Sequence, residues 1–197
     1  FTHAGIGLKK LGQFHLEKDE IPAKMGALKE ALHLTEIMYL STCNRVEFIF
    51  VTTDALPENF ISEFVRNFNS DWDETYAESI RKKARTWNGI NAVNHLIEVA
   101  SSLDSMVLGE REIISQVRNA YNFAKATGLS GDTLRVIIRH TIETAKKVYT
   151  DTSIAEKSVS VVSLAYRELM KRSIPLNARI LIIGSGITNQ NMVIATL

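Results

Sequence analysis

Two kinds of apolar pattern run along the 197-residue chain. Apolar residues that recur every three or four positions predict amphipathic helices, and short runs of β-branched and aromatic residues predict strands. The helical pattern covers residues 23–34, 58–68, 90–106 and 111–128, a segment from the SGDT sequence at 130–133 to about residue 149, and residues 158–171. Residues 37–40 and 46–53 predict strands, whereas residues 1–22 are expected to be irregular. We expect an α+β domain with a small sheet and several helices.

The pattern changes near the end of the chain. Residues 180–183 form a wholly apolar run that leads directly into Gly184-Ser185-Gly186. This is typical of the first strand and phosphate-binding turn of a dinucleotide-binding βαβ unit, although Asn189 replaces the third glycine of the motif. A glycine turn after a buried strand of another kind is the alternative.

These patterns predict an overall α/β class with three parts. Residues 1–150 form the first domain, residues 151–173 form a linking helix, and residues 174–197 begin a truncated Rossmann domain. The chain opens on Phe1 and ends at Leu197 before the βαβ unit is complete. We therefore expect a fragment of a longer protein.

Charge is balanced overall but unevenly distributed. The net charge of +1 gives no general argument for nucleic-acid binding. Residues 54–79 carry seven acidic side chains against one basic, whereas residues 111–150 carry seven basic against three acidic. Arg135, Arg139 and Lys146 have spacings that place them on one helical face. Such a face is usually solvated, and binding of a polyanion is the alternative.

Cys43 is the only cysteine. A single cysteine excludes an intrachain disulfide and a cysteine-based zinc site, which fits a reducing, cytoplasmic location, and no metal site is expected. No apolar run reaches the ~18 residues that a membrane span needs. Cys43 lies in the predicted turn 41–45, where it is either a buried packing residue or a reactive thiol. Backbone N–H groups of the turn and the charge of Arg45 would favour its thiolate.

Three other sites allow more than one interpretation. His95 is a lone histidine that falls off the apolar stripe of its helix, and such residues are usually structural or on the surface. The Asp104-Ser105 pair and the triplet Glu110-Arg111-Glu112 could mark a helix end and a helix start with capping charges. Periodicity alone assigns none of them a chemical role.

Four longer motifs resemble one known family. STCNRVEF, HLIEVASSLDSMVLGEREIISQV, SVSVVSLA and ILIIGSG occur in the order and at the spacing found in glutamyl-tRNA reductases. The resemblance covers essentially the whole chain. It implies NADPH-dependent reduction of glutamyl-tRNA(Glu) to glutamate-1-semialdehyde, the first step of five-carbon-pathway tetrapyrrole and heme biosynthesis. It also implies a homodimer in the full-length protein and a possible partnership with the downstream glutamate-1-semialdehyde aminomutase.

The resemblance also implies site residues. Cys43 corresponds to the nucleophile that forms a thioester, and His95 to a histidine needed for activity. The substrate-binding positions are Thr42, Asn44, Arg45, Ser105, Glu110, Arg111, Glu112 and Gln116, and the NADPH-binding positions are Gly184, Ser185, Gly186, Ile187, Thr188 and Asn189. Arg45 would hold the carboxylate of the glutamyl group. Glu112 replaces an amide that many members carry, and Asn189 replaces a glycine.

Two other classes of function stay open. One is a Rossmann dehydrogenase without a covalent step, and the other is an inactive tRNA-binding or regulatory module. The dehydrogenase interpretation leaves the motifs around Cys43 and His95 unexplained.

Overall fold

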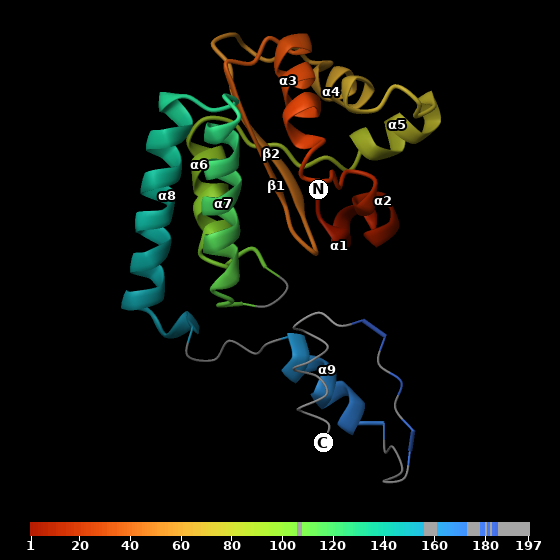
Figure 1. The fold of residues 1–197 in the computed structure, drawn as a ribbon, viewed down its shortest axis with the longest axis vertical. Helices are drawn as coiled ribbons and strands as arrows, with labels where there is room; N and C mark the ends of the chain where they lie inside the picture. Colours follow the sequence, from red (N-terminus) through yellow and green to blue (C-terminus); the bar gives the residue numbers. More distant parts are fainter. Residues whose placement is uncertain (106–107, 156–160, 173–177, 180, 182, 185–197) are drawn as a thin grey trace.

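The computed structural model describes residues 1–105, 108–155, 161–172, 178–179, 181 and 183–184, and its main part has three layers. A hairpin of two antiparallel strands, β1 (Glu36–Ser41) and β2 (Val46–Val51), forms the middle layer. Helix α3 (Ile21–Ala31) packs on one side of it, and α7 (Glu112–Ala126) packs on the other (Figure 1). This arrangement confirms the α+β prediction.

The sheet explains why the first apolar run is continuous. Residues 36–40 of β1 are all buried because helices cover both faces of the strand. A strand that is buried on both faces loses the alternation of polar and apolar residues. The N-terminal residues extend this layer, since Thr2 forms an antiparallel bridge with Arg45 and Phe1 exchanges two backbone hydrogen bonds with Val46.

An aromatic cluster joins the sheet to the helices beside α3. The ring of Phe48 on β2 packs against Phe64 and Phe68 of α4 (Phe60–Phe68), and Phe14 packs against Phe68 and Trp72. Aromatic pairs of this geometry add to the free energy gained from burial. The cluster fixes the short helices α1 (His3–Ile6), α2 (Leu8–Gly12) and α5 (Glu74–Arg81) around the N-terminal segment.

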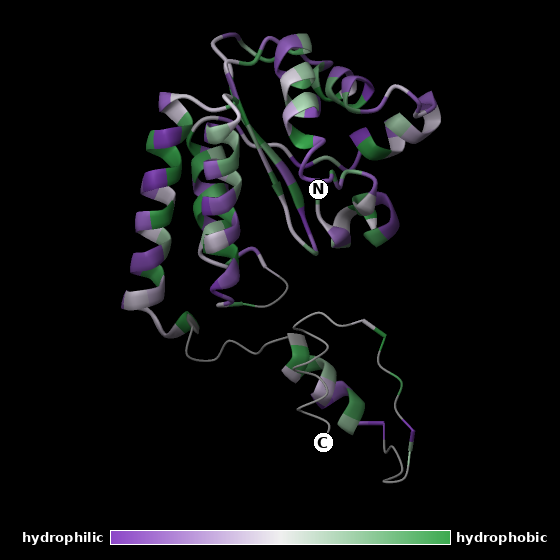
Figure 2. Cartoon of the chain, in the orientation of Figure 1, coloured by the Kyte–Doolittle hydropathy of each residue, from purple (hydrophilic) through white to green (hydrophobic). Residues whose placement is uncertain are grey.

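Three helices cover the other side of the sheet. They are α6 (Ile90–Ala100), α7 and α8 (Asp132–Asp151), which contact one another. Figure 2 shows hydrophobic positions of α7 and α8 turned inward and hydrophilic positions turned to solvent. A short 3₁₀ helix (Ser153–Ala155) follows α8, and α9 (Val161–Met170) completes the described helices. No described helix combines the length and the apolar character that a membrane crossing requires.

Several sequence predictions need correction. Residues 1–22 are not irregular, since they contain α1 and α2, and α5 was not predicted. The helix predicted to reach residue 106 ends at Ala100, because the backbone turns at Ser102, whose φ is 60°. Ile90 was assigned to the apolar stripe of this helix but is 69% exposed.

A nucleotide-binding strand was predicted at residues 180–183. The described residues of this segment do not form one. Leu181 and Ile183 lie in no strand and are 84% and 83% exposed. The sheet in the described part of the chain consists of β1 and β2 alone. Residues 180 and 182 and the predicted loop residues 185–189 lie outside the described part of the chain.

A buried carboxylate connects the start of β1 to α8. Glu36 is 7% exposed, and its carboxylate accepts hydrogen bonds from the backbone N–H groups of Gly131, Thr133 and Leu134 at 2.7–2.9 Å. The SGDT side chains therefore do not cap α8, because Glu36 accepts the free N–H groups of its first turn. A Cβ on Gly131 would lie 3.0 Å from the Glu36 carboxylate, which explains a glycine at this position.

We expect Glu36→Ala to lower the free energy of unfolding by about 2–3 kcal/mol, because three N–H groups of the first turn, of which that of Leu134 is buried, lose a charged acceptor. Urea unfolding followed by circular dichroism measures the change. Glu143→Ala is the matched control, since Glu143 is an exposed acid on the same helix and its loss should cost less than ~0.5 kcal/mol. Equal losses for the two variants would contradict the capping role.

Candidate active site

The β1–β2 turn presents Cys43 to solvent. The ladder closes with Ser41 opposite Val46, and the Thr42 N–H donates to the Arg45 carbonyl at 2.9 Å, which leaves Cys43 and Asn44 at the tip. Cys43 is exposed. The structure therefore excludes a buried packing role for this cysteine.

The Thr42 side chain holds the turn. Its hydroxyl accepts from the backbone N–H groups of Asn44 and Arg45 at 3.4 and 3.3 Å and donates to the Asn44 side-chain oxygen at 3.3 Å. Hydroxyl side chains commonly stabilise turns in this way. The two N–H groups that could have stabilised a Cys43 thiolate are therefore already hydrogen-bonded.

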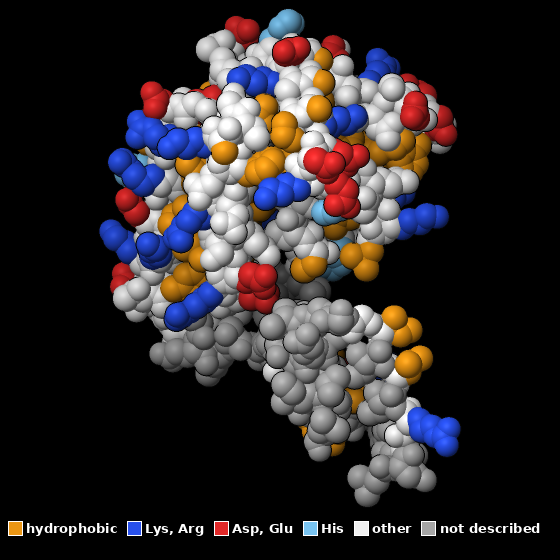
Figure 3. Space-filling view, viewed as in Figure 1, with side chains coloured by type: hydrophobic (Ala, Val, Ile, Leu, Met, Phe, Trp, Pro, Cys, Tyr) orange, Lys and Arg blue, Asp and Glu red, His pale blue; other side chains and the backbone are white. Residues whose placement is uncertain are grey.

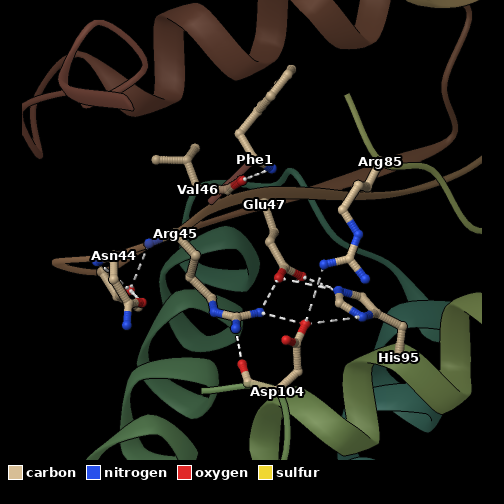
Figure 4. A network of polar contacts seen from close by, with 9 residues as sticks. Phe1, Asn44, Arg45, Val46, Glu47, Arg85, His95 and Asp104 are labelled. Atoms are coloured by element: carbon tan, nitrogen blue, oxygen red, sulfur yellow. Dashed lines mark hydrogen bonds and ion pairs between the residues drawn. The ribbon is translucent and has the colours of Figure 1, made fainter. Parts of the chain in front are cut away.

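Arg45 points inward, into a cluster of charged side chains behind the turn (Figure 4). The residue is 3% exposed, and its Nη1 lies 2.6 Å from Glu47 Oε1 and 3.6 Å from Asp104 Oδ2. Its Nη2 donates to the Asp104 backbone carbonyl. Alternate residues of a strand share a face, which explains why Arg45 and Glu47 both reach this side of the sheet.

His95 joins the same cluster from α6. It is 7% exposed, so its position off the apolar stripe does not place it on the surface. Its Nε2 donates to both oxygens of the Glu47 carboxylate at 3.1 and 3.2 Å, since an ionised carboxylate can only accept. The imidazole stacks on the Trp87 indole with ring centroids 3.6 Å apart. These contacts fix the ring and leave Nδ1 facing Asp104.

Burial acts to raise the pKa of Glu47, but other effects outweigh it. The hydrogen bond from His95 and the attraction of His95 and Arg45 lower the pKa, so that it lies below its ordinary value. Glu47 is therefore ionised in the folded protein at neutral pH, and it holds both Arg45 and His95.

A polar pocket of about 600 Å³ opens beside this cluster. His95 and Trp87 form part of its wall, and the remaining lining residues are Thr86, Asn88, Asn91, Asn94 and Glu98. The guanidinium of Arg85 lies 4.8 Å from the centre of the Trp87 ring. No group of three or more His, Cys, Asp or Glu residues in the described part of the chain is arranged to hold a metal ion.

Comparison with known proteins assigns the family. The family model for the glutamyl-tRNA(Glu) reductase N-terminal domain matches residues 1–152. The chain belongs to the glutamyl-tRNA reductase family.

Individual relatives in this family are similar over most of the chain. A glutamyl-tRNA reductase from Saccharolobus solfataricus is 35% identical over 189 residues, which cover 94% of this chain and 42% of that protein. One from Xylella fastidiosa is 34% identical over 87% of this chain and 38% of its own length. A solved structure of the enzyme from Methanopyrus kandleri gives a TM-score of 0.62 at 30% identity, over 87% of this chain and 38% of that one. The chain thus spans about two fifths of these relatives.

The other substrate positions suggested by the family resemblance lie at the α6–α7 connection. Ser105 is half-buried. The backbone N–H of Glu110 donates a hydrogen bond to the Ser102 hydroxyl oxygen at 3.1 Å. The Tyr149 hydroxyl donates to the Glu110 carbonyl at 3.0 Å. Of the remaining positions on α7 and just before it, Arg111 and Glu112 are exposed and Gln116 is half-buried. The roles of these side chains in substrate binding stay predictions from the family resemblance.

Only one of the six expected NADPH-binding residues lies in the described part of the chain. Gly184 is described, with a φ of 113°, whereas Ser185, Gly186, Ile187, Thr188 and Asn189 lie outside the described residues. NADPH binding stays a prediction from the family resemblance.

Sequence reasoning missed three members of the cluster. Glu47 lies within the STCNRVEF motif, and its position two residues after Arg45 on a predicted strand was a usable signal for a shared face. Asp104 was considered only as a capping charge. Arg85 comes from a segment without a recognisable pattern, and only the folded structure brings it to His95 and Asp104.

Proposed function

We propose that this chain is the N-terminal catalytic domain of a glutamyl-tRNA reductase, which reduces glutamyl-tRNA(Glu) to glutamate-1-semialdehyde for tetrapyrrole and heme biosynthesis. The observation that carries the proposal is the exposed Cys43 at a rigid turn, in a chain whose family is established by the match over residues 1–152. An exposed thiol can reach an ester carbonyl at the end of a large substrate, which a buried thiol cannot.

Cys43 acts as the nucleophile in this proposal. Its thiolate attacks the ester carbonyl carbon, an S–C bond forms, and the bond to the ribose oxygen breaks, so that tRNA leaves and a glutamyl thioester remains. The ribose oxygen takes up a proton as it leaves. NADPH would supply the hydride that reduces the thioester, after which the aldehyde leaves and the thiolate is restored.

His95 is the proposed proton donor for the leaving ribose oxygen. Its Nε2–H is bound to Glu47, so Nδ1 is the nitrogen that can exchange a proton with substrate. A carboxylate that fixes one imidazole nitrogen sets the orientation and tautomer of the ring. Glu47 therefore serves as a positioning residue.

The proposed tRNA-binding surface is the basic face of α8 and the adjoining part of α7. Arg118, Lys125, Arg135, Arg139 and Lys146 are all exposed, and Figure 3 shows Lys and Arg side chains gathered over these helices. Arg139 and Lys146 form no ion pair with a carboxylate among the described residues, so their charges are available to phosphates. Proteins recognise double-stranded RNA mainly through its backbone and shape.

Arg139→Glu is expected to weaken tRNA binding about tenfold at low salt and to lower the slope of log affinity against log salt by about 1. Filter binding of tRNA(Glu) across a salt series measures both quantities. Lys9→Glu is the matched control, because Lys9 is an exposed cation on α2, on the other side of the sheet (Figure 1). If the two variants behave alike, the face of α8 is merely solvated.

Trapping of the thioester tests the proposed function. The full-length protein is incubated with glutamyl-tRNA in the absence of NADPH, and peptides are examined by mass spectrometry. We expect a glutamyl adduct on Cys43 that is released by hydroxylamine, and formation of glutamate-1-semialdehyde once NADPH is added. Reduction that proceeds without any adduct would support a dehydrogenase with no covalent step. The homodimer and the partnership with an aminomutase are likewise proposals for the full-length protein.

A further inference from the structure

Asp104 has an unusual environment for a carboxylate. Its Oδ2 atom is buried and accepts no hydrogen bond from the described residues, yet three nitrogen atoms surround it. Arg45 Nη1 lies at 3.6 Å, His95 Nδ1 at 3.8 Å and Arg85 Nη1 at 4.0 Å. Each distance is too long for a good hydrogen bond, although each allows an electrostatic attraction. The three groups thus attract this carboxylate without holding it closely.

Two of these groups, the guanidinium groups of Arg45 and Arg85, would form an anion-binding subsite if the Asp104 carboxylate moved away, and His95 Nδ1 would then face substrate. Arg45 and Arg85 carry two positive charges, and Glu47, which is bound to Arg45 and His95, supplies one negative charge. Without Asp104 the cluster has an excess of at least one positive charge. A ligand carboxylate would restore the balance that Asp104 now provides.

Two of the described residues near Asp104 expose large apolar side chains. Asp104 lies in the connection between α6 and α7, and its neighbour Leu103 is 48% exposed, as is Leu108 at 57%. Backbone turns with positive φ at Ser102 and Gly109 lie on either side of it. The Asp104 side chain itself is 34% exposed, whereas that of Arg45 is only 4% exposed. The Asp104 carboxylate can therefore rotate toward solvent, while the Asp104 backbone carbonyl keeps its hydrogen bond from Arg45.

We infer that Asp104 is an internal stand-in for a substrate carboxylate, and that it blocks a subsite formed by Arg45 and Arg85 until ligand displaces it. The inference rests on the proposed function for its ligand class, a short aliphatic chain that ends in a carboxylate, as the free end of a glutamyl group does. It assigns Arg85 a role in substrate binding in addition to its contact with Trp87, and it explains how Arg45 can bind substrate although its guanidinium is paired with Asp104 here.

Glutarate, a five-carbon dicarboxylate, is the probe for this subsite. Isothermal titration calorimetry of the full-length protein should show about tenfold tighter binding of glutarate to Asp104→Asn and Asp104→Ala than to the wild type, because the internal competitor is removed. Arg85→Gln should bind glutarate about tenfold more weakly. Asp71→Asn, at an exposed position, is the matched control and should leave the affinity unchanged.

Kinetics separate this role from a purely structural one. With glutamyl-tRNA as substrate, Asp104→Asn should lower KM more than it changes kcat, whereas loss of a structural contact would raise KM or lower kcat. Glutarate affinity that is unchanged or weaker in both Asp104 variants would overturn the inference, even if the enzyme proves to be a reductase. Tighter glutarate binding in a protein that forms no thioester would instead refute the proposed function and leave the subsite standing.

Discussion

Replacement of Cys43 by alanine in the full-length protein is expected to abolish reduction of glutamyl-tRNA, with kcat reduced by a factor on the order of 10³ or more. The covalent step has no substitute within this chain, because Cys43 is the only cysteine among its 197 residues. Cys43→Ser should be almost as inactive, since a hydroxyl at a turn without a general base is a poor nucleophile. Steady-state formation of glutamate-1-semialdehyde is the measurement.

Stability serves as the control for this variant. Cys43 is exposed, so its replacement should change the free energy of unfolding by less than ~0.5 kcal/mol and leave tRNA binding intact. An inactive variant that is folded and binds tRNA isolates the chemical step. Retention of more than about a tenth of the wild-type kcat would rule out the thioester route.

Glu47→Ala should cause the largest loss of stability, about 3–5 kcal/mol, because it leaves a buried guanidinium and a buried imidazole without their main partner. Arg45 is 3% exposed and His95 is 7% exposed, so water cannot replace the lost carboxylate. Urea unfolding at pH 7 measures the change. Glu74→Ala is the matched control, since the ion pair of Glu74 with Arg66 is exposed and its loss should cost less than ~1 kcal/mol.

Glu47→Gln keeps the shape of the side chain and tests the charge separately. The pKa of Glu47 is lower in the folded protein than the ~4.3 of an unfolded chain. Its ionised form therefore contributes stability that is present above the unfolded pKa and is lost as pH falls through the folded pKa. Glu47→Gln should be less stable than the wild type at pH 7, and the difference should shrink below about pH 4.3. A difference that is constant with pH would contradict this account.

The hairpin and most long helices could be predicted because their signals are local. The runs at residues 37–40 and 46–53 match β1 and β2 closely, and the turn at Cys43 follows from the short gap between them. Helices α1, α2 and α5 have at most eight residues, too few for a periodic pattern to emerge. Tertiary packing into the hydrophobic core positions these short helices instead.

The candidate site could be predicted only in part, because its contacts join distant segments. The exposure of Cys43 follows from a turn, but the inward course of Arg45 depends on Glu47, Asp104 and His95, which lie on three different segments. We expected the charge of Arg45 beside the thiol. The carboxylates of Glu47 and Asp104 instead draw its guanidinium inward. Likewise, no local pattern could reveal that Glu36 caps a helix that begins 96 positions later.

Strand β1 sets the distance between the beginning of α8 and the turn that carries Cys43. Its first residue, Glu36, is bonded to the beginning of α8, and its last, Ser41, leads into the turn that presents Cys43. Six residues of strand cover about 17–20 Å, and a strand that is paired and buried along its length bends little. The first turn of α8 and the Cys43 thiol are therefore held at a fixed separation. Under the proposed function, a tRNA bound on the basic face of α8 would reach the thiol only if its aminoacyl end lay at a matching distance.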